Sequence, residues 1–218
     1  MNTSFRLTGF ALLCLLATPP AAHAAIITDL FNTGQAAIGS PDPNYTLTSG
    51  LNPPATVRTP NIGWLSAPAG SEWIGPDGIN GVSFVYETQF TLPSIAVLAS
   101  VIVSGEFASD NATTDILING VSTGIDNFGA SPFVPFTTLT PFTLPTSALV
   151  HGVNTIEFLI SNDSATSDSG LLVTNTSGTF TAVPEPTTVA SGLVGLVGLA
   201  ALRRRRCCRR RCCRRRGC

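Results

Sequence analysis

The sequence predicts an all-β fold, a β-sandwich of the jelly-roll type, for the central domain at residues 25–182. This region shows no sustained helical period. Short runs rich in Val, Ile, Thr and Phe alternate instead with clusters of Gly, Pro, Asn, Asp and Ser, which is typical of strands and turns. About eight such runs in one region favour a sandwich. The region has no cysteine, and its length is sufficient to bury a core without disulfides.

The clearest strand is predicted over residues 83–92, where apolar and polar side chains alternate. Its apolar face, interrupted only by Thr88, carries Phe84, Tyr86, Phe90 and Leu92. A second strand, at residues 115–118, runs into Asn119-Gly120 and resumes at Val121, which predicts a two-residue hairpin. Further strands are predicted at residues 101–107, 155–160, 170–173 and 178–182.

Residues 1–24 predict a secretory signal peptide, which signal peptidase would cleave between Ala24 and Ala25. One arginine precedes an apolar run at residues 7–17, and an Ala-His-Ala sequence follows it. The run is shorter than a bilayer span, which argues against a permanent anchor. A lipoprotein signal at Cys14 is disfavoured because a large leucine precedes that cysteine.

The C-terminal region combines three features in a fixed order. A Pro-Glu-Pro tripeptide comes first, then an uncharged apolar segment at residues 187–202, then ten of the 12 arginines. As a helix, the apolar segment would span about 24 Å, slightly less than the hydrocarbon core of a bilayer. Arginines stay on the cytoplasmic side, so a transmembrane helix here would leave the domain outside. An ordinary C-terminal anchor is the alternative.

Residues 183–206 resemble the PEP-CTERM sorting signal of Gram-negative bacteria, with Pro184, Glu185 and Pro186 as the motif. The resemblance implies recognition by an exosortase, a membrane-embedded cysteine protease. It also implies removal of the segment and transfer of the domain to the cell surface or extracellular medium. Residues 207–218 depart from the family pattern and are interpreted as a low-complexity Arg/Cys extension, with a metal site at the cysteine pairs as the alternative.

The domain is strongly acidic once the ends are set aside. Between residues 25 and 183 there are 12 acidic side chains and one basic side chain, Arg58, which gives a net charge near −11. Such a field repels nucleic acid and anionic membranes. We therefore expect no nucleic-acid partner.

A second resemblance runs from Asn61 to Val173. Its pieces are Trp64, residues 72–74, 85–93, 108–111, 118–120, 152–156 and 161–162. They are similar to galactose-binding-like jelly rolls, which are common in carbohydrate-binding modules. The resemblance implies a jelly-roll fold and a frequent sugar-binding role.

Three pairs of residues are candidate ligand contacts. Trp64 and Trp73 are the two tryptophans of the chain, and exposed indole rings would stack on the C–H faces of sugars. Tryptophan is more often mostly buried in a small β-core. Asp110 and Asn111 offer the oxygen ligands that calcium prefers, and Asp163 and Asp168 form a second such cluster. Turn hydrogen bonding is the alternative for both.

The sequence favours a binding or structural protein over an enzyme. His151 is the one histidine of the domain, and no catalytic motif accompanies it. We expect an exported, exosortase-sorted surface or matrix protein whose sandwich binds polysaccharide. One alternative is a purely structural or adhesive matrix protein. Another is a secreted glycan hydrolase, which would need two carboxylates about 5 to 9 Å apart in one cleft.

Overall fold

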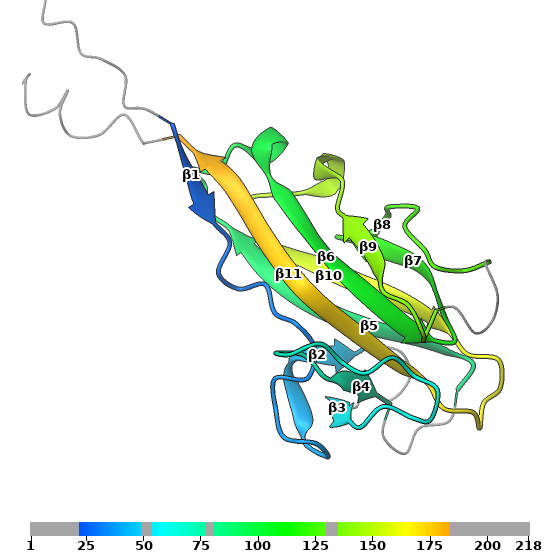
Figure 1. Ribbon diagram of the computed structural model, residues 1–218. Coiled ribbons are helices and arrows are strands. Elements are labelled where there is room, and N and C mark those ends of the chain that lie inside the picture. Colours follow the sequence, from blue (N-terminus) through cyan, green and yellow to red (C-terminus); the bar gives the residue numbers. More distant parts are fainter. Residues whose placement is uncertain (1–21, 49–53, 77–80, 130–134, 184–218) are drawn as a thin grey trace, which may run out of the picture.

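The computed structural model describes residues 22–48, 54–76, 81–129 and 135–183 (Figure 1). Its regular elements are β-strands, apart from two single-turn 3-10 helices, η1 (Leu98–Ser100) and η2 (Thr146–Ala148). The all-β prediction is therefore confirmed for the described residues. The sorting motif, the predicted helix at 187–202 and most of the signal peptide lie outside them. Within the described ranges, no helix has the length and hydropathy to cross a membrane.

Eleven strands form one antiparallel sheet that curls over on itself. Along the sheet their order is β8-β7-β10-β5-β2-β3-β4-β11-β6-β9, and β1 pairs with β11. Their bounds are β1 (His23–Ile26), β2 (Pro41–Leu47), β3 (Pro54–Arg58), β4 (Trp73–Gly75), β5 (Ser83–Leu92), β6 (Ile102–Asp110), β7 (Ala112–Ile118), β8 (Val121–Ser122), β9 (Thr140–Thr143), β10 (Gly152–Ser161) and β11 (Gly170–Ala182).

The main hydrophobic core lies between the two layers that this curl creates. Phe107 on β6 and Phe142 on β9 belong to one end of the strand order, whereas Phe158 on β10 lies near the other end. The ring centroids of Phe107 and Phe142 each lie 6.0 Å from that of Phe158. The two ends of the sheet therefore face each other across a packed aromatic core, as in a sandwich.

The two clearest local predictions are confirmed. Strand β5 has the predicted bounds, Ser83–Leu92, and every second residue from Phe84 to Leu92 is buried, with Thr88 among them. The hairpin between β7 and β8 turns at Asn119 and Gly120, whose φ angles are 52° and 75°. A type I′ turn requires positive φ at both central residues, and Asn-Gly is a dipeptide that tolerates it, so these two residues predict the hairpin.

The prediction of two separate strands at residues 170–173 and 178–182 is wrong. The chain continues through both as β11, and its pairing with β6 shifts register between Thr174 and Ser177. Asn175 has a φ of 53° within that irregular stretch. The turn-forming residues between the two runs therefore make a bulge in one strand instead of a reversal of the chain.

Strands β1 and β11 bring the two ends of the described domain together. His23 pairs with Ala182, and the predicted cleavage bond between Ala24 and Ala25 lies within β1. In Figure 1 the chain enters and leaves at the same end of the molecule, while β3 and β4 lie at the opposite end. Cleavage at that bond remains a prediction.

Candidate functional site

A cavity of about 440 Å³ lies at the end of the domain formed by β3, the end of β4 and the loop between β10 and β11. Pockets that bind small molecules usually measure roughly 300 to 1,000 Å³. Its lining is largely polar, and the side chains that matter for binding are Thr56, Arg58, Asn61, Thr166, Ser167 and Asp168. We call it the Arg58 cavity.

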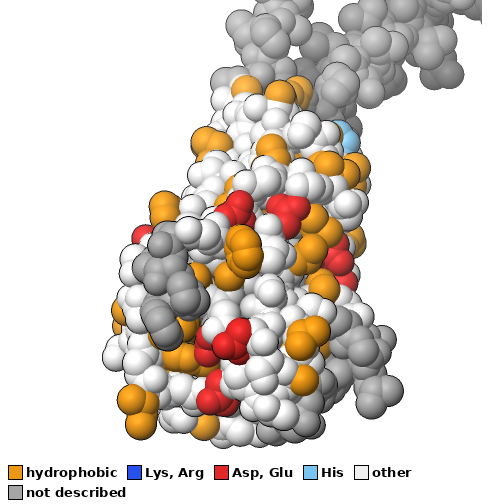
Figure 2. Space-filling model, turned by 90° about the vertical axis from the view of Figure 1, so that its right-hand side faces the viewer, with side chains coloured by type: hydrophobic (Ala, Val, Ile, Leu, Met, Phe, Trp, Pro, Cys, Tyr) orange, Lys and Arg blue, Asp and Glu red, His pale blue; other side chains and the backbone are white. Residues whose placement is uncertain are grey.

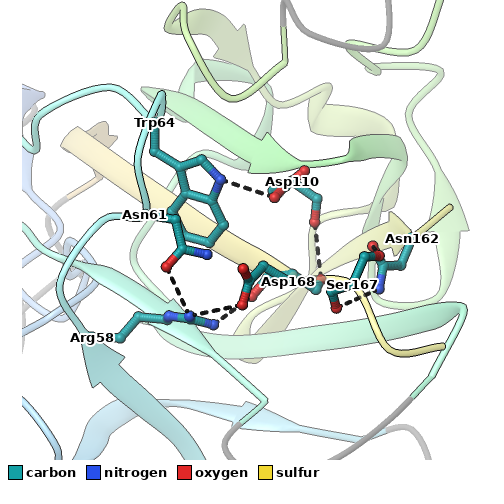
Figure 3. Close-up of polar contacts among 8 residues, drawn as sticks. Arg58, Asn61, Trp64, Asp110, Asn162, Ser167 and Asp168 are labelled. Carbon is teal, nitrogen blue, oxygen red and sulfur yellow. Dashed lines mark hydrogen bonds and ion pairs between the residues drawn. The ribbon is translucent and has the colours of Figure 1, made fainter. Parts of the chain in front are cut away.

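Arg58 is held in place from several sides, as Figure 3 shows. Its Nη2 atom donates to Asn61 Oδ1 at 3.2 Å and to Asp168 Oδ1 at 3.3 Å, and Nη1 donates to the backbone oxygen of Ser169 at 3.2 Å. Its guanidinium carbon lies 5.2 Å from the ring centroid of Trp64, within the range of a cation–π contact. Described residues therefore accept hydrogen bonds from three of its five N–H groups, and the guanidinium has a fixed orientation.

The orientation of the Asn61 amide follows from that of Arg58. A guanidinium only donates hydrogen bonds, so Asn61 must present its oxygen to Arg58 and turn its nitrogen away. That Nδ2 atom is buried and has no acceptor among the described residues. A buried donor without a partner is costly, by roughly 1 to 3 kcal/mol.

Asp168 supplies the acceptor of the cavity. Its side chain is 62% exposed, against 30% for Arg58, so their ion pair contributes little to folding stability. Asp168 is instead positioned by the loop at residues 162–169. Asn162 anchors that loop, because its Nδ2 donates to the backbone oxygens of Gly81, Ser164 and Ser167. Such local bonds are characteristic of Asn- and Ser-rich loops.

Trp73 is corrected from a candidate sugar contact to a core residue. It has no exposed surface, and its Nε1 donates to the backbone oxygen of Leu65 at 2.9 Å. It belongs to a second, smaller core with Ala108 and Leu172. A ring without an exposed face cannot stack on a sugar. The rest of the fold decides this burial, because the partners come from β6 and β11.

Trp64 lies beside the cavity and supports it. The ring is partly exposed, its centroid is 4.3 Å from that of Trp73, and Arg58 lies over it. Its Nε1 donates to Asp110 Oδ2 at 2.9 Å. Trp64 therefore positions the guanidinium of Arg58, and stacking of its partly exposed ring on a sugar remains a prediction.

Asp110 and Asn111 anchor loops, and their role as calcium ligands remains a prediction. Asp110 Oδ2 accepts from Trp64, and Asn111 Oδ1 accepts from the backbone nitrogen of Asp163 at 2.9 Å. One side-chain oxygen of each residue is thus engaged within the protein. No group of three or more His, Cys, Asp or Glu side chains that could hold a metal ion occurs in the part of the chain that the structure describes.

The Asp110 carboxyl has an altered pKa. Burial raises the pKa to about 6, the hydrogen bond from Trp64 opposes that rise, and the negative charges of Asp163 and Asp168 add to it. The side chain is only 7% exposed, so it cannot gain much hydration when it ionises. The Asp110 carboxyl therefore bonds directly to the Trp64 ring, which in turn contacts Arg58.

The sequence interpretation did not identify Arg58 or Asn61 as site residues, and it considered Asp168 only together with Asp163, as a second cluster of possible calcium ligands. Arg58 did carry a signal, because it is the one basic side chain between residues 25 and 183. Asn61 carried none, since a polar residue next to proline is common in loops. Arg58 and Asp168 are 110 residues apart and meet only in the folded chain.

No family model and no curated protein matches this chain. Several solved structures are similar to it at low identity. One is a Paenibacillus sp. cycloisomaltooligosaccharide glucanotransferase complexed with cycloisomaltoheptaose (14% identity, 66% of this chain and 19% of that chain, TM-score 0.35). Another is the family 11 carbohydrate-binding module of Clostridium thermocellum in complex with a β-1,3-1,4-mixed-linked tetrasaccharide (15% identity, 73% of this chain and 96% of that chain, TM-score 0.36). A third is the CBM36-1 domain of a multidomain xylanase from the hindgut metagenome of Trinervitermes trinervoides (11% identity, 73% of this chain and 96% of that chain, TM-score 0.28). Likeness of this degree does not establish a shared function.

Proposed function

We propose that this chain is an exported surface or matrix protein whose β-domain binds a neutral polysaccharide in the Arg58 cavity. The observation that carries the binding proposal is the fixed set of planar polar groups on Arg58, Asn61 and Asp168. Adjacent sugar hydroxyls both donate and accept hydrogen bonds, so they match a site that presents donors beside an acceptor. Because these side chains are already held in place, binding costs little conformational entropy.

The charge of the domain favours a neutral ligand. Carboxylated or sulfated polysaccharides would be repelled by a domain with a net charge near −11. The single local cation, Arg58, is already paired with Asp168. Neutral sugars meet no such repulsion.

Two alternatives remain, and the structure bears on each. Burial of Trp73 favours a purely structural or adhesive matrix protein, because it removes one of the two aromatic platforms. A glycan hydrolase needs a second carboxylate in the same cleft. Among the described residues that line the Arg58 cavity, Asp168 is the one carboxylate. We therefore propose binding without hydrolysis.

Glycan-array binding by the purified full-length chain tests the proposal. Arg58→Lys keeps the charge but loses the planar fork, and Asp168→Asn removes the charged acceptor. We expect each to reduce binding by at least tenfold, while Gln89→Ala, on the exposed face of β5, leaves it unchanged. Absence of binding by the folded wild-type chain would instead favour the matrix protein without a ligand.

The export and sorting part of the proposal rests on the ordered features at residues 183–206. In support, the described domain begins and ends at one pole, and the Arg58 cavity involves β3 and β4 at the other (Figure 1). A chain tethered at its C-terminal end would thus hold the cavity away from the membrane. Replacing Pro184, Glu185 and Pro186 with alanine should leave an unprocessed, membrane-retained precursor, and normal release of that variant would disprove the sorting proposal.

A further inference from the structure

A second cavity, of about 380 Å³, adjoins the same loop at residues 162–169. Its surface is mainly apolar, and the side chains that bear on its chemistry are Asn111, Phe128 and Asp163. We call it the Phe128 cavity. None of these side chains lines the Arg58 cavity, so the two are separate.

Phe128 is exposed although the backbone around it is firmly held. Its side chain is 66% exposed. The preceding residue, Asn127, exchanges hydrogen bonds with the backbone of Thr113 at 3.1 and 2.7 Å, and its Nδ2 donates to Ser109 Oγ at 3.2 Å. The backbone nitrogen of Phe128 donates to Asp126 Oδ1 at 3.0 Å. Since Ser109 and Thr113 are fully buried, this network presents the phenyl ring from a rigid base.

Two polar groups accompany the ring. Asn111 Oδ1 accepts from the backbone nitrogen of Asp163, which leaves the Asn111 nitrogen as a donor. Asp163 Oδ1 accepts from Ser167 Oγ at 2.6 Å, which fixes the carboxylate and leaves its second oxygen as an acceptor. An exposed aromatic ring beside a donor and an acceptor matches a sugar, which has an apolar C–H face and a polar rim.

The two cavities are close enough for one ligand chain. Asp163 lines the Phe128 cavity, and Ser167 and Asp168 line the Arg58 cavity. Asp163 and Asp168 are five positions apart in the chain, so their Cα atoms lie at most about 18 Å apart. The hydrogen bond from Ser167 to Asp163 ties the two sides of the loop together.

We propose that the Phe128 cavity is a second subsite for the same glycan, so that the ligand is a linear, neutral polysaccharide that crosses the loop at residues 162–169. Phe128 stacks on one sugar ring while the Arg58 cavity binds another. Among the described residues, the side of the molecule where β7 and β8 lie shows acidic and apolar side chains and no Lys or Arg (Figure 2), which suits an uncharged chain. This inference rests on the proposed function and adds the length of the ligand to it.

The test compares short and long ligands by isothermal titration of the full-length chain in detergent. The probes are neutral di- and hexasaccharides of glucose, xylose, mannose and galactose. For at least one sugar, we expect the hexasaccharide to bind the wild type about tenfold more tightly than the disaccharide, a difference of about 1.4 kcal/mol. Phe128→Ala should abolish that gain and leave disaccharide affinity unchanged, and Phe128→Trp should restore it. Ile102→Ala, which removes an exposed apolar side chain from β6, is the matched control.

The outcomes separate the two proposals. If the Phe128→Ala variant keeps the hexasaccharide gain, or if the wild type shows no gain with length, the second subsite is refuted and the Arg58 site stands. If Arg58→Lys leaves disaccharide binding intact, or if no sugar binds the folded wild type, the proposed function itself is refuted. Thermal melting of each variant shows whether a loss of binding reflects loss of the fold.

Discussion

The buried carboxyl of Asp110 leads to a prediction about stability and pH. Its pKa of about 6 in the folded protein exceeds the ordinary value of 3.8, so the native state binds this proton more tightly than the unfolded chain does. The contribution of Asp110 to stability is therefore fully present below pH 3.8 and is lost as the pH rises through about 6. A difference of about two pKa units corresponds to about 3 kcal/mol.

Asp110→Asn removes the charge and keeps an oxygen that can accept from Trp64 Nε1. At pH 7.5 we expect this variant to be more stable than the wild type, by up to about 3 kcal/mol. The advantage should shrink toward zero as the pH falls below 4, because the wild-type carboxyl is then neutral as well. The difference between the two proteins isolates Asp110 from every other titrating group.

Urea denaturation at half-unit intervals from pH 3 to 8 measures this difference through the midpoint and the slope of the transition. Asp126→Asn, an exposed change that keeps its side-chain oxygen, is the matched control and should alter stability by less than about 0.5 kcal/mol. Parallel stability–pH curves for Asp110→Asn and the wild type would refute the reasoning. Lower stability of Asp110→Asn at pH 7.5 would refute it as well.

Two further predictions concern the supports of the site and of the fold. Trp64→Phe should lower the free energy of unfolding, measured in urea, by about 1 to 3 kcal/mol and should weaken glycan binding, because Asp110 loses its indole donor. Unchanged stability would contradict this. Gly34→Ala should lower the melting temperature strongly, since φ is +78° and an added Cβ would lie 2.3 Å from Glu72 Cβ. Gly39→Ala is the control, with φ at +83° and no atom within 4 Å, and an equal loss in both variants would show that the contact with Glu72 is unimportant.

The candidate site also explains why a residue type alone was a poor guide to ligand contacts. Trp73 and Phe128 are both large aromatic residues, yet the first is fully buried and the second is 66% exposed. Trp73 meets Ala108 and Leu172 in the second core, whereas Asn127 holds the backbone beside Phe128 at the surface. In both cases the decisive partners lie elsewhere in the chain: Ala108 and Leu172 for Trp73, and Ser109 and Thr113 for Asn127.

The sequence by itself determined those features that depend on neighbours along the chain. Alternation of apolar and polar residues defined β5 and its buried face, and Asn119-Gly120 defined the β7–β8 turn through the φ angles that those residues tolerate. Only the tertiary structure decided where the Arg58 cavity lies. It forms because β3 pairs with β4 and β4 pairs with β11, which brings Arg58 next to a loop 110 residues away. Such pairing depends on the packing of the whole sheet, and no local pattern of residues specifies it.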